Sequence, residues 1–278
     1  MLTPTASLLT EKVAIVTGGG GGIGKSISQT YAAYGAKVVV AEIERDRADE
    51  TVREIRDAGG EALSVVTDVR VREQVAAMAD AAFDSYGRVD ILVNNVGDYL
   101  QISKPFLEST EDEWQQLYDV NLRHIFLCCQ AVVPRMVEAG RGGSVINFST
   151  IEAFRGIPHL AAYSAFKGAI TQFTKSFALD MGPHHIRVNA IAPEKTQSVQ
   201  MWSEDSISDE QRRLIPYWVP IGRLGTADDM AGIAVFLASD MSQYVTGTTV
   251  HADGGCLAAG GLYRDKTGRW GSTPAGLA

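Results

Sequence analysis

The sequence predicts an α/β protein: a single Rossmann-like, doubly wound domain with a seven-stranded, mainly parallel sheet and helices on both faces. Seven short runs rich in β-branched residues alternate with longer segments of helical hydrophobic spacing. This alternation is typical of a parallel sheet covered on both faces. The first run leads directly into a glycine-rich turn and then a helix, as in nucleotide-binding units. No linker divides the chain, so we expect residues 1–278 to form one domain.

The expected elements follow one another in regular order. The strands should be the β-branched runs Val13–Thr17, Lys37–Ala41, Ala62–Thr67, Val89–Val93, Ser144–Phe148, Arg187–Ile191 and Thr248–His251. The helices should be the segments with apolar residues every three to four positions: Ile23–Tyr34, Arg47–Ala58, Val71–Tyr86, Glu111–Ala139, Ala161–Met181 and Ala227–Ala238. Ligands of such sheets bind beyond the carboxyl ends of the strands, so we expect the site there.

Two segments break this alternation. Residues 193–223 are rich in polar and helix-breaking residues, with a short helical piece near 208–214, and a connection of this length is often a functional lid. Residues 256–278 contain few core-forming side chains. We expect this C-terminal extension to be either loosely ordered or an arm that packs on a neighbouring subunit, because Leu262, Tyr263 and Trp270 favour burial.

Composition excludes several classes of protein. The 278-residue chain is 45% hydrophobic and 21% charged, with a formal net charge of −8, which argues against a nucleic-acid partner. The first ten residues lack the features of a signal peptide, and no apolar run is long enough to span a membrane. The three cysteines form neither a disulfide framework nor a metal-ligand pattern. We therefore expect no metal and a reducing, cytoplasmic location.

The glycine-rich turn predicts a phosphate-binding site. Val13–Thr17 is followed at once by a run of glycines from Gly18 to Gly22, then by Ile23 and Gly24. Glycines let the backbone approach a pyrophosphate closely, while free N–H groups and the helix dipole favour the anion. A flexible glycine turn is the alternative, but the strand before it and the helix after it favour nucleotide binding.

The end of the second expected strand indicates which nucleotide binds. Glu42 lies about twenty residues past the glycine turn, where an acidic side chain accepts hydrogen bonds from the adenosine ribose hydroxyls. A carboxylate there would repel a 2′-phosphate, so we expect NAD, with NADP less favoured. Arg45 and Arg47 lie close enough in sequence to weaken this preference.

Tyr163 and Lys167 form the strongest candidate for catalysis. Four residues apart on a helix, they lie one above the other on a partly apolar face. A nearby ammonium favours phenolate and should lower the pKa of the tyrosine from its reference value of about 10. Asn121 lies in the apolar stripe of another expected helix and needs a partner there. It is either a satisfied buried asparagine or part of a proton relay with the tyrosine and lysine.

Taken in order, these motifs resemble the classical short-chain dehydrogenases/reductases over nearly the whole chain, from about Glu11 to Gly255. The matching residues are Thr17–Gly24, Asp68, Val69, Asn94–Gly97, Asn121, Ser149, Thr150, Tyr163, Lys167, Pro193, Gly222–Gly225 and Val245–Gly255.

The resemblance implies hydride transfer between a nicotinamide and a secondary alcohol or ketone, with Tyr163 as general acid/base. It implies that Lys167 bonds the nicotinamide ribose and lowers the tyrosine pKa, while Asn121 holds a water of the proton relay. The implied cofactor contacts, besides Glu42, are Gly18, Gly22, Ile23, Gly24, Asp68, Val69, Asn95, Gly97, Tyr163, Lys167, Pro193, Thr196 and Ser198. Family members are commonly tetramers joined through the two helices that here would be Glu111–Ala139 and Ala161–Met181, so we predict a homotetramer.

The chain departs from the family pattern at two positions. Thr150 stands thirteen residues before the tyrosine, where the family usually has serine. We expect its hydroxyl to bind the substrate oxygen, because Ser149 should point to the other face of the strand. Glu194 follows Pro193, where the family commonly has glycine, and could bind a polar substrate group or point to solvent. The candidate substrate contacts are Glu152, His159, Glu194 and Trp202, although a surface loop is the favoured interpretation for His159.

The leading functional hypothesis is an NAD-dependent dehydrogenase or ketone reductase for a small secondary alcohol. We expect a cyclic or aryl substrate of alicyclic, terpenoid, steroid or dihydrodiol type, because apolar side chains should surround the pocket: Phe154, Ile157, Leu160, Trp202, Tyr217 and Trp218. The alternatives are an NADPH-dependent 3-oxoacyl-carrier-protein reductase and a catalytically silent, nucleotide-sensing regulator on the same fold. The complete Tyr, Lys and Asn set argues against the regulator. Glu42 and the negative charge argue against the reductase.

Overall fold

The computed structural model describes residues 3–196 and 207–272, and its centre is one sheet of seven parallel strands in the order β3-β2-β1-β4-β5-β6-β7. The strands are β1 (Val13–Thr17), β2 (Lys37–Glu42), β3 (Glu61–Val66), β4 (Ile91–Asn94), β5 (Gly143–Phe148), β6 (Ile186–Pro193) and β7 (Thr249–Ala252). This order is that of a doubly wound sheet. The predicted fold class is confirmed, and each strand lies within two residues of its expected bounds.

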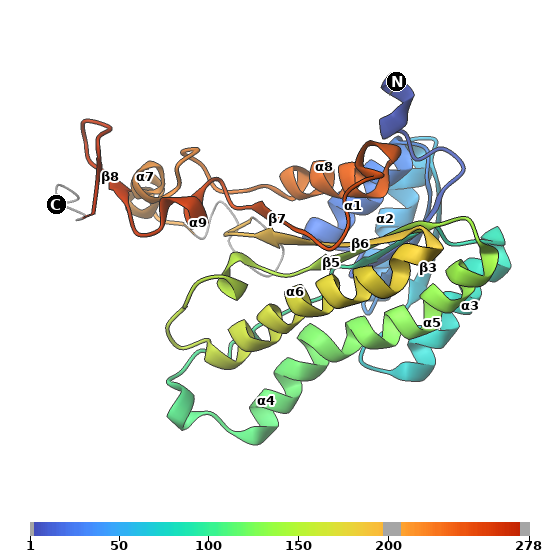
Figure 1. Cartoon of the computed structure of the whole chain (residues 1–278), viewed down its shortest axis with the longest axis horizontal. Helices are drawn as coiled ribbons and strands as arrows, with labels where there is room; N and C mark the ends of the chain where they lie inside the picture. The colour runs from blue at the N-terminus through green and yellow to red at the C-terminus, as the bar shows by residue number, and fades with distance from the viewer. Residues whose placement is uncertain (1–2, 197–206, 273–278) are drawn as a thin grey trace.

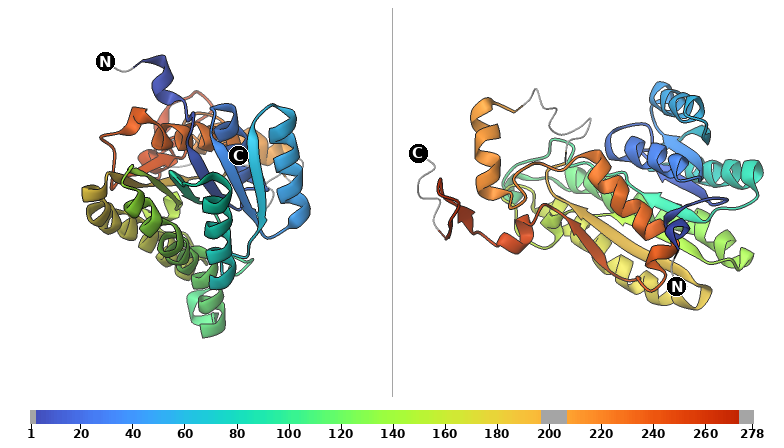
Figure 2. Two further views of the ribbon diagram at one scale, coloured as in Figure 1. Left: turned by 90° about the vertical axis from the view of Figure 1, so that its right-hand side faces the viewer. Right: turned by 90° about the horizontal axis from the view of Figure 1, so that it is seen from above.

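Helices cover both faces of the sheet (Figures 1 and 2). One face carries α1 (Gly22–Ala33), α2 (Arg45–Asp57) and α8 (Ala227–Ala238). The other carries α3 (Arg72–Tyr86), α5 (His124–Ala139) and α6 (Ala161–Met181), with α4 (Glu111–Tyr118) continuing toward one end of the molecule. Among the described residues, no helix is both long enough and apolar enough to cross a membrane.

The central strands are buried on both sides, which explains their continuous β-branched runs. In β1, Ala14 and Val16 pack under α1 and α8, while Val13 and Ile15 pack against the helices of the opposite face. The sheet therefore separates two hydrophobic cores. The carboxyl ends of its strands share one edge, where polar residues follow each strand.

The helix predicted over Glu111–Ala139 is divided in the structure. A π-helical turn at Asp119–Arg123 separates α4 from α5. Asn121 lies at its centre and donates a side-chain hydrogen bond to the carbonyl of Leu117, at 2.9 Å. Such a turn inserts one residue into the helix and often marks a functional site. Here it brings Asn121 toward the loop after β4.

The helical part of the first of these two segments and the described part of the second, residues 256–272, lie together at one end of the molecule (Figure 1). The expected short helix is α7 (Asp209–Trp218), which is longer than predicted and begins with a capping box between Ser208 and Gln211. The C-terminal extension contains α9 (Cys256–Ala259) and an antiparallel hairpin of β8 (Tyr263–Arg264) and β9 (Trp270–Gly271). The sequence did not predict this hairpin. The lid and subunit-arm roles of these segments stay predictions.

Candidate active site

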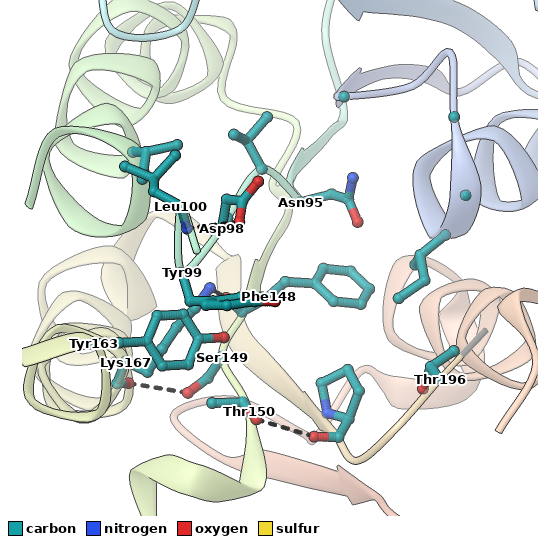
Figure 3. A pocket seen from close by; sticks show the side chains of 18 of the residues that line it. Asn95, Asp98, Tyr99, Leu100, Phe148, Ser149, Thr150, Tyr163, Lys167 and Thr196 are labelled. Carbon is teal, nitrogen blue, oxygen red and sulfur yellow. Dashed lines mark hydrogen bonds between the residues drawn. The ribbon is translucent and has the colours of Figure 1, made fainter. Parts of the chain in front are cut away.

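A cavity of about 640 Å³ lies at the carboxyl edge of the sheet, across the point between β1 and β4 where the strand order reverses. It is lined by the glycine turn, by residues at the ends of β2, β4, β5 and β6, and by α6. Doubly wound sheets bind their ligands at this switch point, and the volume suits a small-molecule site. Figure 3 shows Tyr163, Lys167 and Thr150 close together at one side of the cavity.

The glycine turn has no room for side chains. Gly18 has a φ of +62°, and a Cβ there would lie 3.1 Å from the Asn95 amide nitrogen. A Cβ at Gly24 would collide with the carbonyl of Gly18. Asn95 fixes the turn by donating from Nδ2 to the carbonyl of Thr17, at 3.0 Å. The turn thus forms a backbone cradle at the N-terminus of α1, which fits the pyrophosphate of a dinucleotide.

Glu42 is held in place at the end of β2. Its carboxylate accepts hydrogen bonds from the backbone N–H groups of Gly20, at 3.2 Å, and Ile43, at 2.9 Å. The residue is 6% exposed and lines the cavity together with Arg47. An acceptor fixed in this way is suited to ribose hydroxyls.

Asp68 and Val69 line the cavity after β3, as expected for an adenine pocket. The guanidinium of Arg70 binds the Asp68 carboxylate with two hydrogen bonds of 2.9 and 2.8 Å, which lowers the pKa of that carboxyl. Arg70 also lines the cavity. Sequence reasoning missed it, although its position directly after the Asp68–Val69 motif was a usable signal.

Lys167 is almost completely buried beside Tyr163. Its Nζ donates to the carbonyl of Phe148, at 3.2 Å, and lies 5.7 Å from the centroid of the Tyr163 ring. The residue is 3% exposed. Burial lowers the pKa of Lys167 from 10.5 to about 8, and the negative charge of Asp98 opposes this change.

The expected lowering of the Tyr163 pKa is not produced by the residues of the chain. Burial raises the pKa of the Tyr163 phenol, and the negative charges of Glu152 and Asp98 raise it further. The sequence argument considered only the lysine four residues away. Both carboxylates come from other segments of the chain. Burial also lowers the pKa of Lys167, so the ammonium that should favour phenolate holds its proton less tightly.

Asn121 is fully buried, and its side chain is engaged in three hydrogen bonds. Nδ2 donates to the carbonyls of Leu117 and Asp98, and Oδ1 accepts from the backbone N–H of Asp98, at 3.2 Å. A Cβ at Gly97 would collide with Lys167 Nζ and lie 3.2 Å from Asn121 Oδ1. The amide therefore lies directly behind Gly97 and next to the lysine. Its partners are those of a satisfied buried asparagine, and a role in a proton relay stays a prediction.

Thr150 and Ser149 have different partners. Ser149 Oγ donates to the backbone carbonyl of Lys167, at 2.9 Å, whereas Thr150 Oγ1 donates to the carbonyl of Pro193, at 3.2 Å (Figure 3). Both residues line the cavity. Ser149 is 5% exposed, whereas Thr150 is only half-buried, so Thr150 is the better placed of the two to meet a substrate oxygen.

The predicted contacts divide into three groups. Those that line the cavity are Gly18, Gly22, Ile23, Glu42, Asp68, Val69, Asn95, Gly97, Thr150, Glu152, Tyr163, Lys167, Pro193, Glu194 and Thr196. Gly24 and Asn121 lie behind the lining, and Ser198 and Trp202 fall outside the described residues.

The structure places His159 in a loop outside the cavity lining. It is exposed, its backbone φ is +66°, and it is absent from the cavity lining. Its carbonyl accepts a hydrogen bond from the backbone N–H of Lys104, which fixes the loop in this position. The alternative of a surface loop describes it correctly.

The expected aromatic pocket is also corrected. Phe154 packs edge-on against His251, with ring centroids 4.5 Å apart, and Trp218 packs against a small core under α7. Neither they nor Tyr217 line the cavity, whereas Ile157 and Leu160 do. The loop after β4 contributes the lining residues that sequence reasoning missed: Asp98, Tyr99, Leu100 and Ser103. Its position after the Asn94–Gly97 motif was the signal for them.

Comparison with known proteins agrees with this architecture. Residues 18–256 match the model of a family described as enoyl-(acyl carrier protein) reductase. The chain is similar to 3beta-hydroxysteroid dehydrogenase 1 of Eggerthella lenta, with 38% identity over 89% of this chain and 94% of the relative. It is also similar to the 3-oxoacyl-[acyl-carrier-protein] reductase FabG of Chlamydia muridarum, with 35% identity over 90% of this chain and 98% of that protein.

A solved structure of 7 alpha-hydroxysteroid dehydrogenase, complexed with NADH and 7-oxo glycochenodeoxycholic acid, superposes with a TM-score of 0.85. The two chains are 34% identical, and the match covers 92% of this chain and 98% of the other. The chain therefore belongs to the classical short-chain dehydrogenase/reductase family and is an oxidoreductase that acts on alcohols or ketones.

Proposed function

We propose that the protein transfers a hydride between NAD(H) and a secondary alcohol or ketone, with Tyr163, Lys167, Asn121 and Thr150 as its catalytic residues. One observation carries the proposal. Tyr163, Lys167 and Thr150 meet at one side of a cavity that also contains the glycine cradle and Glu42. A proton donor, an ammonium and a nucleotide cradle in one cavity are the parts that carbonyl reduction requires.

In this mechanism the Thr150 hydroxyl binds the substrate oxygen. The Tyr163 hydroxyl gives a proton to that oxygen during reduction, and the deprotonated Tyr163 oxygen takes the proton back during oxidation. The bound nicotinamide supplies or accepts the hydride. Lys167 holds positive charge beside the phenol and binds the nicotinamide ribose. Asn121 keeps the loop at Gly97 and Asp98 in position and holds a water that connects the lysine to solvent.

The preference for NAD rests on Glu42. Its fixed carboxylate accepts hydrogen bonds from ribose hydroxyls and repels a 2′-phosphate. Arg47 and Arg70 line the same part of the cavity and oppose this preference. We expect the nearby, fixed carboxylate to dominate, because Arg70 is already paired with Asp68.

The substrate we propose is a cyclic or aryl secondary alcohol of alicyclic, terpenoid, steroid or dihydrodiol type. Leu100, Ile157 and Leu160 give the catalytic side of the cavity an apolar wall. Two of the similar proteins are named hydroxysteroid dehydrogenases.

The second candidate is an NADPH-dependent 3-oxoacyl-carrier-protein reductase, which the similarity to FabG favours. Glu42 and the net charge of −8 argue against it, since that reaction requires NADPH and docking of an acidic carrier. A catalytically silent regulator is disfavoured because Tyr163, Lys167 and Asn121 are all present.

A screen of secondary alcohols with NAD⁺ and NADP⁺ tests the proposal. Absorbance of the reduced nicotinamide is the readout, and 3-oxoacyl thioesters with NADPH form the competing arm. We expect oxidation of cyclic alcohols with a kcat/KM at least about tenfold higher for NAD⁺ than for NADP⁺. A preference for NADPH and 3-oxoacyl thioesters would replace the first candidate with the second.

We further propose a cytoplasmic homotetramer joined through α4–α5 and α6. Phe173 and Phe177 on α6 are only partly buried and Leu179 on the same helix is exposed, so this helix presents apolar surface that an interface would cover. Light scattering of the purified protein measures the assembly, and a monomer would refute it.

A further inference from the structure

The catalytic side of the cavity contains a pair of carboxylates that the chemistry above does not use. Glu152, after β5, and Glu194, after β6, both line the cavity. Their side chains are 11% and 8% exposed. Carboxylates in so little water need a cation or hydrogen-bond donors to stabilise them.

Arg155 supplies the cation. Its Nε and Nη2 donate to the two oxygens of Glu152, at 2.8 and 2.9 Å, and Nη2 also donates to Glu194, at 2.8 Å. Arg155 is itself absent from the cavity lining. The guanidinium therefore belongs to a residue outside the lining, whereas the two glutamates that it binds line the cavity.

Arg155 leaves some hydrogen-bond acceptor positions unused on both carboxylates. An ionised carboxyl group has about four acceptor positions, and Arg155 uses two on Glu152 and one on Glu194. Two carboxylates and one guanidinium also leave the group with one negative charge. Burial and the Glu152 charge raise the pKa of Glu194, which indicates that its carboxylate is under-stabilised by the chain alone.

The backbone segments that carry these carboxylates are hydrogen-bonded to Thr150, the residue proposed to hold the substrate oxygen. Thr150 Oγ1 donates to the carbonyl of Pro193, the residue before Glu194, and accepts from the backbone N–H of Glu152, at 3.4 Å. A small molecule whose oxygen contacts Thr150 therefore shares a cavity with Glu152 and Glu194, which line it along with Thr150. Asp98 adds a third carboxylate to this side of the cavity. The lining also includes Lys195, whose Nζ lies 5.1 Å from the ring centroid of Trp218.

We propose that Glu152 and Glu194, held by Arg155, form an acceptor subsite for a second hydroxyl group of the substrate. The inference rests on the proposed function and narrows its substrate class to diols and hydroxyketones. An anionic group is disfavoured at this subsite itself, because it would face Glu152 and Glu194, which share one guanidinium.

The test uses one ring scaffold with NAD⁺. The probes are cyclohexanol, the cis and trans 1,2-, 1,3- and 1,4-cyclohexanediols, their mono-methyl ethers, and 4-hydroxycyclohexanecarboxylate. The ethers keep the bulk and the oxygen but lose the donor. We expect one diol to exceed both cyclohexanol and its own ether in kcat/KM by at least about tenfold, as for a hydrogen bond to a charged group. The carboxylate should be the poorest substrate.

Substitutions test whether Glu152 and Glu194 cause the preference for a diol over its ether. Glu194→Met and Glu152→Met remove acceptor oxygens at similar side-chain length, so the diol-to-ether ratio should fall toward one. Glu194→Gln retains an acceptor oxygen and should keep part of the ratio. Glu73→Gln, on the exposed surface of α3, is the matched control and should leave the ratio unchanged. Thermal unfolding and NADH titration verify that each variant is folded.

Two results would overturn the subsite. One is wild-type protein that oxidises cyclohexanol or the ethers as well as every diol, and the other is a diol preference that survives both methionine variants. If no probe is oxidised, the affinities of the diols and of their ethers for the NADH-saturated protein are compared by calorimetric titration. Tighter binding of a diol than of its ether would support the subsite, and equal affinities would reject it. Absence of turnover on every alcohol with either nucleotide would instead contradict the proposed function.

Discussion

Replacing Lys167 by methionine should stabilise the protein while abolishing its activity. The ammonium is 3% exposed, and burial lowers its pKa from 10.5 to about 8. The same shift measures how much folding disfavours the charged form, and it corresponds to about 3 kcal/mol of stability lost at pH 7. Methionine fills a similar volume without a charge. The variant loses the hydrogen bond to Phe148, which offsets about 1 kcal/mol.

The net expectation is a gain of about 2 kcal/mol in the free energy of unfolding at pH 7, measured by urea denaturation without added nucleotide. The gain should depend on pH in a defined direction. A group whose pKa is lowered by folding binds fewer protons in the native state, so the stability of the wild type rises between pH 8 and 10.5. The advantage of the variant should therefore shrink as pH rises from 7 to 9.5.

Lys167→Met that is less stable than the wild type at pH 7, or a stability difference that does not change with pH, would refute this reasoning. The first result would mean that Lys167 contributes favourable contacts larger than its desolvation cost. The second would mean that its pKa is not shifted by folding. A stabilising but inactivating change is expected where a buried charge is retained for function.

Three further predictions concern neighbouring parts of the site. Thr150→Ser should keep kcat/KM within about fivefold, whereas Thr150→Val should lower it on the order of a hundredfold, because only serine retains the hydroxyl; equal activities would exclude a contact with the substrate oxygen. Gly97→Ala places a Cβ against the Nζ of Lys167, which must shift from its position, so kcat/KM should fall at least about tenfold; an unaffected kcat/KM would show that the lysine position is not critical. Glu42→Ala should raise the NADPH-to-NADH ratio of kcat/KM by about tenfold or more, and an unchanged ratio would remove Glu42 from cofactor selection.

The sequence was sufficient for the sheet and the nucleotide cradle because both depend on local patterns. Strands buried on both faces appear as β-branched runs, and the glycine turn joins a strand to a helix within a few residues. Tyr163, Lys167 and Thr150 could be grouped because two of them share α6 and the third ends β5, at the carboxyl edge of the sheet.

Features that depend on distant residues could not be predicted. The π-helical turn inserts one residue into a helix without disturbing its apolar stripe, so periodicity indicates one continuous helix. Arg155 joins two glutamates that are 42 residues apart in the sequence. The rise in the Tyr163 pKa comes first from burial and then from the charges of Glu152 and Asp98, and only the fold buries the phenol and brings these carboxylates near it.

The central claim is that the Tyr163 hydroxyl transfers the proton during turnover, and Tyr163→Phe tests it most directly because it removes that hydroxyl alone. The measurement is kcat/KM for the best alcohol of the screen with NAD⁺, with NADH affinity and thermal unfolding as controls. We expect a loss of about a hundredfold or more, with the variant folded and NADH still bound. A folded variant that retains kcat/KM within about threefold of the wild type would contradict the claim.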